Sequence, residues 1–297
     1  MSAATVLCPV DFSDESRNAL RWARVVAARR RATLIVLHAV DPLLAEAARV
    51  HAGRELEGVE TERALRDFVG ATVPEDPTLH ERVAVHVRAG DPADVILEEA
   101  GREQPVLIVM GTHGLGGFQK LLIGSTTEHV LRQARQPVLA VPPAVENAPQ
   151  TGDPSAWIRK ILVATDFSAA AMDAVRWAAG FARELGVPLV IAHVVVPAKV
   201  APAWQSLVEQ TTEARAAEAR GRIDALSKEF PGLAAETIVA IDRVDDALPS
   251  LAEQRGASLI VLGLTSEEGA RAQRPGIIAY RVLSRAKVPV LLVPRSA

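Results

Sequence analysis

Small residues with regular spacing follow an apolar run in the first half of the chain. Gly111 and Gly114 come first, and Gly124 and Ser125 follow after nine further residues. Glycine lets backbone N–H groups approach an anion, because no Cβ stands in the way. A helix starting at Ser125 would add the positive end of its dipole, and the hydroxyls of Ser125 and Thr126 would add donors. The spacing predicts a phosphate-binding loop.

The second half of the chain carries a damaged version of this pattern. Gly263 and Gly276 keep the outer spacing of thirteen residues. Ser266 and Ile277, however, stand where the first half has its second glycine and its serine. These substitutions indicate that one half kept an anion-binding site and the other lost part of it.

Dense matches along the chain identify an internal repeat. Residues 10–13, Val-Asp-Phe-Ser, return as Thr-Asp-Phe-Ser at 165–168, and the apolar run 137–142 returns at 289–294. A stretch rich in Pro, Asn, Gly and Asp separates the two copies and is typical of an exposed linker. We therefore expect a first domain over residues 1–143, a linker over 144–156 and a second domain over 157–297.

Composition excludes several classes of protein. Of the 297 residues, 49% are hydrophobic and 23% charged, which is ordinary for globular domains. The net charge of −3 gives no support to nucleic-acid binding. No apolar run approaches the roughly 20 residues that a membrane span needs. The single cysteine, Cys8, rules out a disulfide framework and favours a reducing, cytoplasmic location.

Short apolar runs alternate with helical patterns in each copy. In the first copy we expect strands over residues 5–10, 33–40, 83–88, 106–110 and 137–141. Helices are expected from residues 13–14 to about 30, over 44–73, from Asp91-Pro92, and from 125–126 to about 135. Near-continuous apolar strands alternating with helices predict a doubly wound parallel α/β domain.

Ligands in such sheets bind beyond the carboxyl ends of the strands, where the strand order reverses. Asp11 follows the first strand, Val40 ends the second and Gly111 follows the fourth. They converge if the first and fourth strands are neighbours. Asp11 has two interpretations: contact with the ribose or adenine of a nucleotide, or a turn and helix N-cap residue.

Histidines near these positions have competing interpretations. His113 and Lys120 lie inside the loop, where they either contact phosphate or are solvated. His38 and His193 end equivalent strands in both copies, which favours a structural role. No Ser-His-Asp order, carboxylate pair or metal-ligand spacing is evident.

Several motifs in this order resemble the universal stress protein family over essentially the whole chain. They are Val-Asp-Phe-Ser at 10–13, His-Ala-Val at 38–40, Gly-Asp-Pro at 90–92, Met110 through Ser125, and Pro-Val-Leu-Ala-Val-Pro at 137–142. The resemblance implies two tandem domains of the adenine nucleotide alpha hydrolase-like fold, each with a five-stranded parallel sheet of order 3-2-1-4-5. It also implies pairing of the two domains through their last strands.

The resemblance further implies an ATP-binding subclass, with Mg²⁺ carried on the phosphates. The expected site in the first copy consists of Asp11, Val40, Met110, Gly111, Gly114, Gly124, Ser125 and Thr126. The leading hypothesis is a non-catalytic, ATP-binding regulator of the stress response that acts on an unidentified protein partner, with a homodimer left open. The alternatives are a slow ATPase or nucleotidyl- or phosphoryl-transfer enzyme, and a nucleotide-independent scaffold.

Overall fold

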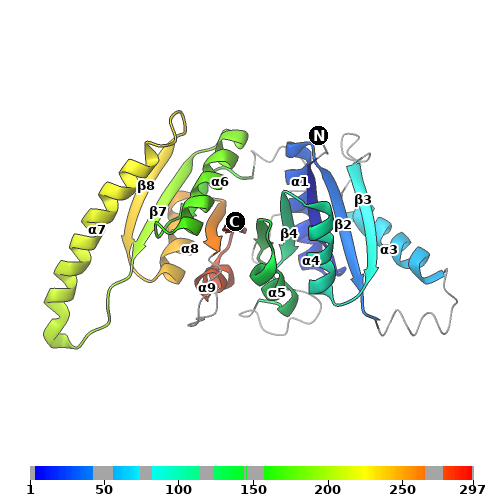
Figure 1. Cartoon of the computed structure of the whole chain (residues 1–297), viewed down its shortest axis with the longest axis horizontal. Coiled ribbons are helices and arrows are strands. Elements are labelled where there is room, and N and C mark those ends of the chain that lie inside the picture. Colours follow the sequence, from blue (N-terminus) through cyan, green and yellow to red (C-terminus); the bar gives the residue numbers. More distant parts are fainter. Residues whose placement is uncertain are drawn as a thin grey trace. The chain divides into compact units, whose positions relative to one another are not determined.

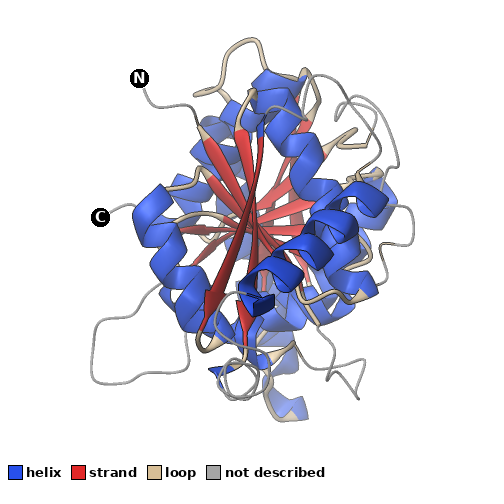
Figure 2. Cartoon of the chain, turned by 90° about the vertical axis from the view of Figure 1, so that its right-hand side faces the viewer, coloured by secondary structure: helices blue, strands red, loops and turns tan. Residues whose placement is uncertain are grey.

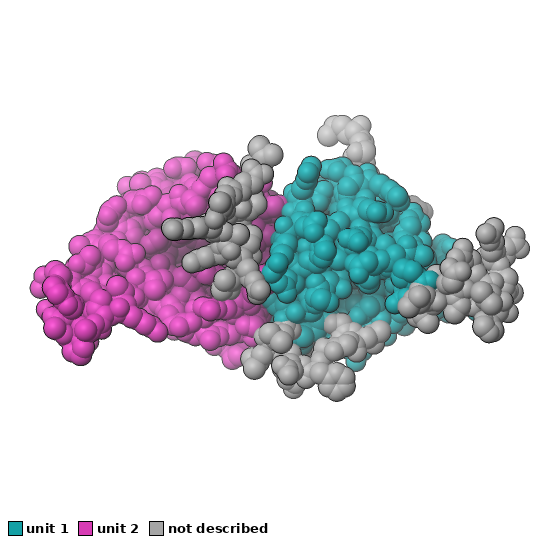
Figure 3. Space-filling model, turned by 60° about the horizontal axis from the view of Figure 1, so that its bottom comes forward, with its two compact units in different colours: residues 1–154 teal, residues 155–297 magenta. Residues whose placement is uncertain are grey.

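The chain divides into two units, residues 1–154 and residues 155–297, which Figure 3 colours separately. The structure, a computed structural model, describes residues 4–42, 56–73, 82–113, 123–143, 145, 157–264 and 277–295. The expected linker, residues 144–156, lies outside the described residues except for Val145. Each unit is described below by itself.

The strands of unit 1 are all parallel and follow the order β3-β2-β1-β4-β5. Their bounds are β1 Thr5–Pro9, β2 Thr33–Val40, β3 Val83–Ala89, β4 Leu107–Gly111 and β5 Val138–Val141. The central strands are almost continuously apolar and buried, as strands covered on both faces must be. Helices, blue in Figure 2, lie on both sides of the strands, which are red.

Side chains cap the helices of unit 1 that begin after Ser13 and after Asp91. They are α1 Asp14–Arg30, α3 Leu56–Thr72, α4 Pro92–Glu103 and α5 Ser125–Gln133. Ser13 accepts a hydrogen bond from the amide of Ser16 at the start of α1, and Asp91 accepts one from Ala93 at the start of α4. These two starts, and the start of α5 at Ser125, agree with the sequence. The helix expected over 44–73 is described only for α3.

Unit 2 repeats this architecture. Its strands are β6 Ile161–Ala164, β7 Leu189–Val195, β8 Ala235–Ile241, β9 Leu259–Leu264 and β10 Val290–Pro294. They are parallel in the order β10-β9-β6-β7-β8. The helices are α6 Ala169–Leu185, the short 3₁₀ turn η3 Pro202–Trp204, α7 Gln205–Ser227, α8 Val244–Arg255 and α9 Ile277–Arg285. Figure 1 labels most of these elements.

Strand order puts the expected site on one edge. In both units the order within the unit is 3-2-1-4-5, so the first and fourth strands are neighbours. The carboxyl ends of β1, β2 and β4 therefore meet at the same edge of the sheet, as the convergence of Asp11, Val40 and Gly111 requires. The expected pairing of the two domains through their last strands stays a prediction. Such pairing would make one continuous sheet of ten strands in place of two separate sheets of five.

Candidate functional site

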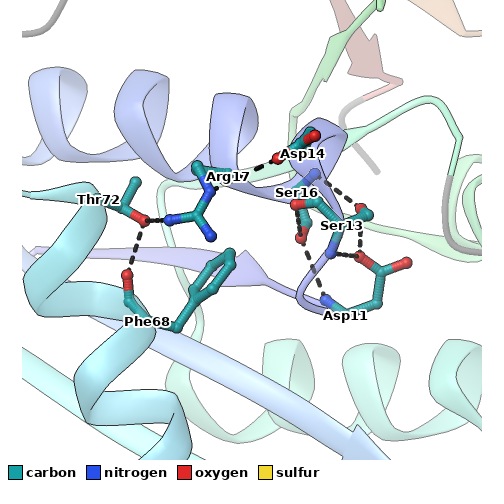
Figure 4. Close-up of polar contacts among 7 residues, drawn as sticks. All are labelled: Asp11, Ser13, Asp14, Ser16, Arg17, Phe68 and Thr72. Carbon is teal, nitrogen blue, oxygen red and sulfur yellow. Dashed lines mark hydrogen bonds and ion pairs between the residues drawn. The ribbon is translucent and has the colours of Figure 1, made fainter.

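The turn after β1 is built from its own side chains (Figure 4). The Oδ1 atom of Asp11 accepts hydrogen bonds from the amide of Ser13 at 3.1 Å and from its hydroxyl at 2.5 Å. The hydroxyl of Ser16 donates to the carbonyl of Ser13 and accepts from the amide of Asp11. The turn role considered for Asp11 is therefore observed, with one carboxylate oxygen committed to the turn, whereas the N-cap residue of α1 is Ser13 and not Asp11.

Unit 2 forms the same turn. Asp166 accepts a hydrogen bond from the amide of Ser168 at 2.9 Å, and Ser168 caps α6 by accepting from Ala171. The phenylalanine between the two residues has a left-handed backbone in both units, with φ of 67° at Phe12 and 65° at Phe167. A non-glycine residue adopts this conformation only where its surroundings compensate the strain. Both units therefore need the turn, whatever they bind.

The paired histidines hold this turn against the sheet. Nδ1 of His38 lies 2.8 Å from the carbonyl oxygen of Val10, and Nδ1 of His193 lies 2.7 Å from that of Thr165. A carbonyl can only accept, so Nδ1 carries the proton in both rings. Each ring also packs on the phenylalanine of its turn, with centroids 4.6 and 4.9 Å apart. The structural role predicted for both histidines is confirmed.

Arg17 joins the start of α1 to the end of α3 (Figure 4). Its Nη1 donates to the hydroxyl of Thr72 at 2.9 Å, and that hydroxyl donates to the carbonyl of Phe68 at 2.7 Å. The guanidinium also stands 4.3 Å from the centroid of the Phe68 ring. Sequence reasoning missed this contact because its partners are 55 residues apart. It fixes the end of α3 against the first turns of α1.

The loop after β4 is anchored at both ends by backbone and threonine contacts. The amide of Gly124 donates to the carbonyl of Thr112 at 2.8 Å, and Thr112 donates its own amide to Val141 at 3.1 Å. The buried hydroxyl of Thr127 donates to the carbonyl of Gly111 at 2.9 Å. The two threonines were not among the expected site residues. Their burial and loop-closing bonds hold Gly111 and Gly124 together.

Packing requires a glycine at the first position of the motif, which is Gly111 in unit 1 and Gly263 in unit 2. A Cβ added to Gly111 would lie 3.3 Å from backbone atoms of Glu15, in the first turn of α1. A Cβ added to Gly263 would lie only 2.5 Å from the carbonyl oxygen of Ala170 in α6. A strand end and a helix start approach too closely there for a side chain. This approach explains why the damaged copy still has its first glycine.

The start of α5 is open to an anion. Gly124 is its N-cap residue and supplies no side-chain hydrogen bond to the first turn. Ser125 is exposed, Thr126 is half-buried, and Thr127 is turned inward. The first amides of a helix point along its axis and carry the positive end of its dipole. An anion at this end would meet backbone donors and the Ser125 hydroxyl without displacing a cap.

The remaining expected residues have different positions. Val40 ends β2, and its carbonyl accepts the amide of Gly90 at 3.1 Å. Met110 is almost fully buried in β4, directly before Gly111. Gly114 lies outside the described residues. His113 places Nδ1 2.9 Å from the hydroxyl of Thr112, and among the described residues its buried Nε2 has no hydrogen-bond partner.

Unit 2 has ion pairs where unit 1 has a helix cap. Arg243 takes the N-cap position of α8, and its guanidinium lies 3.0 Å from Asp245 and 3.2 Å from Asp246. Arg285 of α9 contacts the same two carboxylates. The hydrogen bond from Arg243 lowers the pKa of Asp245 below its ordinary value, against the effect of burial. These four residues, called here the α8–α9 ion-pair cluster, tie the two helices together.

The comparisons with known proteins agree with this repeated architecture. A model of the universal stress protein family matches residues 3–142 and again residues 158–294. The chain belongs to the universal stress protein family. The double match also confirms its tandem form.

Individual universal stress proteins show the same relationship. One from Mycolicibacterium smegmatis is 26% identical over 305 residues, which cover 97% of this chain and 96% of that protein. The universal stress protein in QAH/OAS sulfhydrylase 3'region of Thermus aquaticus is 36% identical over 141 residues, 46% of this chain and 97% of its own length. A crystal structure of a universal stress protein from Archaeoglobus fulgidus covers both chains completely with a TM-score of 0.67 at 20% identity, which supports the fold.

The described part of this universal stress protein contains no group of three or more His, Cys, Asp or Glu residues that could hold a metal ion. Over the same residues, no helix has the length and apolar composition that crossing a bilayer would require.

Proposed function

We propose that unit 1 binds ATP at the carboxyl edge of its sheet and that the protein is a nucleotide-dependent regulator of the stress response. The observation that carries the proposal is the uncapped start of α5, held beside the end of β4 by the Gly111–Thr127 and Thr112–Gly124 hydrogen bonds. Uncapped helix amides next to a glycine loop suit a phosphate group.

The residues present fit a nucleotide in the following way. The phosphates would lie at Gly124, Ser125 and Thr126, with the loop from Gly111 through Gly114 around them. Among the described residues, a Cβ at Gly124 would approach no atom closer than 3.5 Å, so packing against them does not require glycine at this position. Ribose and adenine would lie toward Asp11 and the end of β2 at Val40, above the buried Met110. Mg²⁺ would ride on the phosphate oxygens.

The residues at the carboxyl ends of the strands in unit 1 favour a regulatory role over rapid catalysis. Phosphoryl transfer needs a group that positions or deprotonates the nucleophile. Oδ1 of Asp11 already accepts two hydrogen bonds from Ser13. Nucleotide binding at the start of α5 would instead bias the position of this helix, and a protein partner would read that change. Cys8 is fully buried, and burial raises the pKa of its thiol, which agrees with an inert side chain and not with a catalytic nucleophile.

A second candidate function rests on His113. Its buried Nε2 has no partner among the described residues, although a buried polar nitrogen normally finds one. A histidine at the mouth of a phosphate loop can serve as a slow general acid or base for ATP hydrolysis. Replacing His113 by Asn should then abolish a slow release of phosphate while leaving ATP affinity within about threefold. Unchanged phosphate release would remove this candidate.

Calorimetric titration of the full chain with Mg-ATP tests the leading proposal. We expect one nucleotide per chain, because the second and fourth small residues of the motif, Gly114 and Ser125, are replaced in unit 2 by Ser266 and Ile277. Mass spectrometry of the native protein should detect the same stoichiometry. Two equivalent sites per chain, or no binding at millimolar ATP, would show the assignment to be wrong.

A further inference from the structure

The first three residues of α5 all carry hydroxyl groups, whereas the first three residues of α9 in unit 2 carry none. Both helices are nine residues long, and they begin with Ser-Thr-Thr at 125–127 and Ile-Ile-Ala at 277–279. The hydroxyls of Ser125 and Thr126 belong to the phosphate site proposed above. Thr127 is only 3% exposed, so its hydroxyl has a different role.

Thr127 links the first turn of α5 to the end of β4. Its hydroxyl donates to the carbonyl oxygen of Gly111, the last residue of β4, at 2.9 Å. Beside this contact, the amide of Gly124 donates to the carbonyl oxygen of Thr112 at 2.8 Å. Two consecutive residues, 111 and 112, are thus bonded to the start of the same helix. The two hydrogen bonds form the stem of the loop that runs from β4 to α5.

The two bonds of this stem depend on the sequence in different ways. The bond between Gly124 and Thr112 uses backbone groups, which almost every residue supplies. The bond from Thr127 to Gly111 needs a side-chain donor at this one position. Unit 2 has the buried Ala279 at the equivalent position of α9, and alanine has no donor. The side-chain bond of the stem is therefore specific to unit 1.

The stem determines where the first amides of α5 lie relative to β4. The Gly124 amide is already bonded to Thr112, so the amides of residues 125–127 are the ones that can meet an anion. Hydrogen bonds to phosphate oxygens need donor–acceptor distances of about 2.7–3.2 Å and nearly linear geometry. An anion binds more tightly when its donors already hold this geometry, because binding then costs less ordering.

A histidine next to the stem gives an independent indication of a ligand there. The Cα atom of His113 lies 3.8 Å from the place that a Cβ on Gly124 would take. Its Nδ1 lies 2.9 Å from the hydroxyl of Thr112, and its buried Nε2 has no hydrogen-bond partner within the described ranges. In the tautomer in which Nδ1 accepts from Thr112, Nε2 carries a proton and needs an acceptor. A phosphate oxygen beside the start of α5 is such an acceptor.

We propose that Thr127 is a positioning residue for nucleotide binding in unit 1. Through the carbonyl of Gly111 it holds the first turn of α5 where the amides of this turn meet the phosphates. Its own hydroxyl is buried and bonded to the protein, so it acts on the nucleotide only through the helix. The inference rests on the ATP site proposed above. It explains in addition why Ala279 makes unit 2 a poorer phosphate site than its missing motif residues alone would.

Calorimetric titrations of the full chain with Mg-ATP and with adenosine test this role. Thr127→Val removes the donor and keeps the branched shape, whereas Thr127→Ser keeps the donor. Thr127→Val should weaken the binding of Mg-ATP about tenfold, the size expected for one hydrogen bond. Adenosine has no phosphate, so its affinity should change less than about twofold. Thr127→Ser should bind Mg-ATP within about threefold of the wild type. Thr127→Ala, the residue of unit 2, replaces Thr127→Val if that variant does not fold.

Thr165→Val in unit 2 is the matched control for the loss of a buried threonine hydroxyl. Thr165 is 4% exposed, and its hydroxyl accepts a hydrogen bond from the amide of Phe167 at 3.0 Å. This variant should bind Mg-ATP as the wild type does.

The outcomes separate the role of Thr127 from the proposed function. If the wild type binds Mg-ATP and Thr127→Val binds it equally well, the positioning role is overturned and the ATP site stands. An equal loss of adenosine and Mg-ATP affinity would also overturn the role, since the whole site would then be disturbed. If the wild type binds no Mg-ATP, the proposed function is wrong, and the role of Thr127 is wrong with it.

Discussion

At the end of β4 the backbone of unit 1 leaves room that unit 2 lacks at the end of β9. A Cβ on Gly111 would stand 3.3 Å from Glu15, whereas one on Gly263 would stand 2.5 Å from Ala170. Both glycines are therefore needed for packing, the second more strictly. The packing against Ala170 is enough to account for Gly263, without a lost ligand. Gly114 and Ser125, replaced in unit 2 by Ser266 and Ile277, are the positions at which the motif differs between the two units.

A second difference concerns the helices beside the site. In unit 1, Asp91 caps α4 through the amides of Ala93 and Asp94. In unit 2, the α8–α9 ion-pair cluster replaces this cap and fastens α9 to α8. The corresponding contact in unit 1 is a single pair, His129 with Asp94, at 4.0 Å. Unit 1 thus leaves α5 freer to respond to a ligand at its start.

The largest expected effect comes from filling the space at Gly124. If ATP exceeds its dissociation constant about 1,000-fold, binding stabilises the wild type by roughly 4 kcal/mol. For a domain of this size that raises the melting temperature by on the order of 10 °C. Gly124→Val should abolish this shift, because a branched side chain occupies the space for the phosphate. Differential scanning fluorimetry with and without Mg-ATP measures it.

Gly124→Ala provides the control for folding. Its φ of −59° and the 3.5 Å clearance to Thr112 allow a Cβ without strain. Without ATP, both Gly124 variants should melt within a few degrees of the wild type. A normal ATP-dependent shift in Gly124→Val would count against the phosphate site.

The next effect tests the packing difference between the two first glycines. Gly263→Ala should lower the free energy of unfolding of unit 2 by about 3 kcal/mol, since backbone atoms of Ala170 and Ala171 must move. Gly111→Ala should cost about 1 kcal/mol, because its closest contacts are at 3.3 Å. Urea unfolding of the two variants gives both values. Equal losses would refute the proposed difference.

A smaller effect is expected from the α8–α9 ion-pair cluster. Asp245→Asn should cost about 1.5 kcal/mol at pH 7, because a charge-assisted hydrogen bond is weakened. The pKa of Asp245 is lowered in the folded state, so its stabilising effect is present above the unfolded pKa near 4 and is lost as pH falls below it. Urea unfolding at pH 7 and pH 3 should therefore show a smaller pH effect in the variant.

Asp94→Asn in unit 1 is the matched control for this cluster. The Asp94 side chain is 67% exposed, and in the described part of the chain it forms one ion pair, the 4.0 Å contact with His129. The substitution should change the unfolding free energy by less than about 0.5 kcal/mol. If Asp94→Asn lowers the free energy of unfolding as much as Asp245→Asn does, the ion pairs hold α4 to α5 as firmly as they hold α8 to α9.

The smallest effects separate the structural from the binding role of the first aspartate. Asp11→Ala and Asp166→Ala should each cost about 1 kcal/mol, because both remove the acceptor of the same turn. ATP affinity, measured by calorimetry, should fall only for Asp11→Ala. If neither variant alters ATP binding, the role of Asp11 is confined to the turn.

The sequence by itself determined the repeat, the order of strands and helices along the chain, and three helix starts. These features depend on local patterns: apolar runs of strand length, Ser13 and Asp91 as caps, and proline at the start of α4. The structural role of His38 could also be predicted from the sequence. Both copies have this histidine, at His38 and His193, although only the first copy has the complete glycine motif.

Only the tertiary structure determined the features that depend on contacts between segments distant in the sequence. Glycine is required at positions 111 and 263 because the first turns of helices α1 and α6, at Glu15 and Ala170, lie against these strand ends. Thr112 and Thr127 become site-forming residues only when the loop closes on itself. The contact of Arg285 with Asp245 likewise joins residues from two helices of unit 2. Each depends on a close approach between distant segments, and no local propensity encodes such an approach.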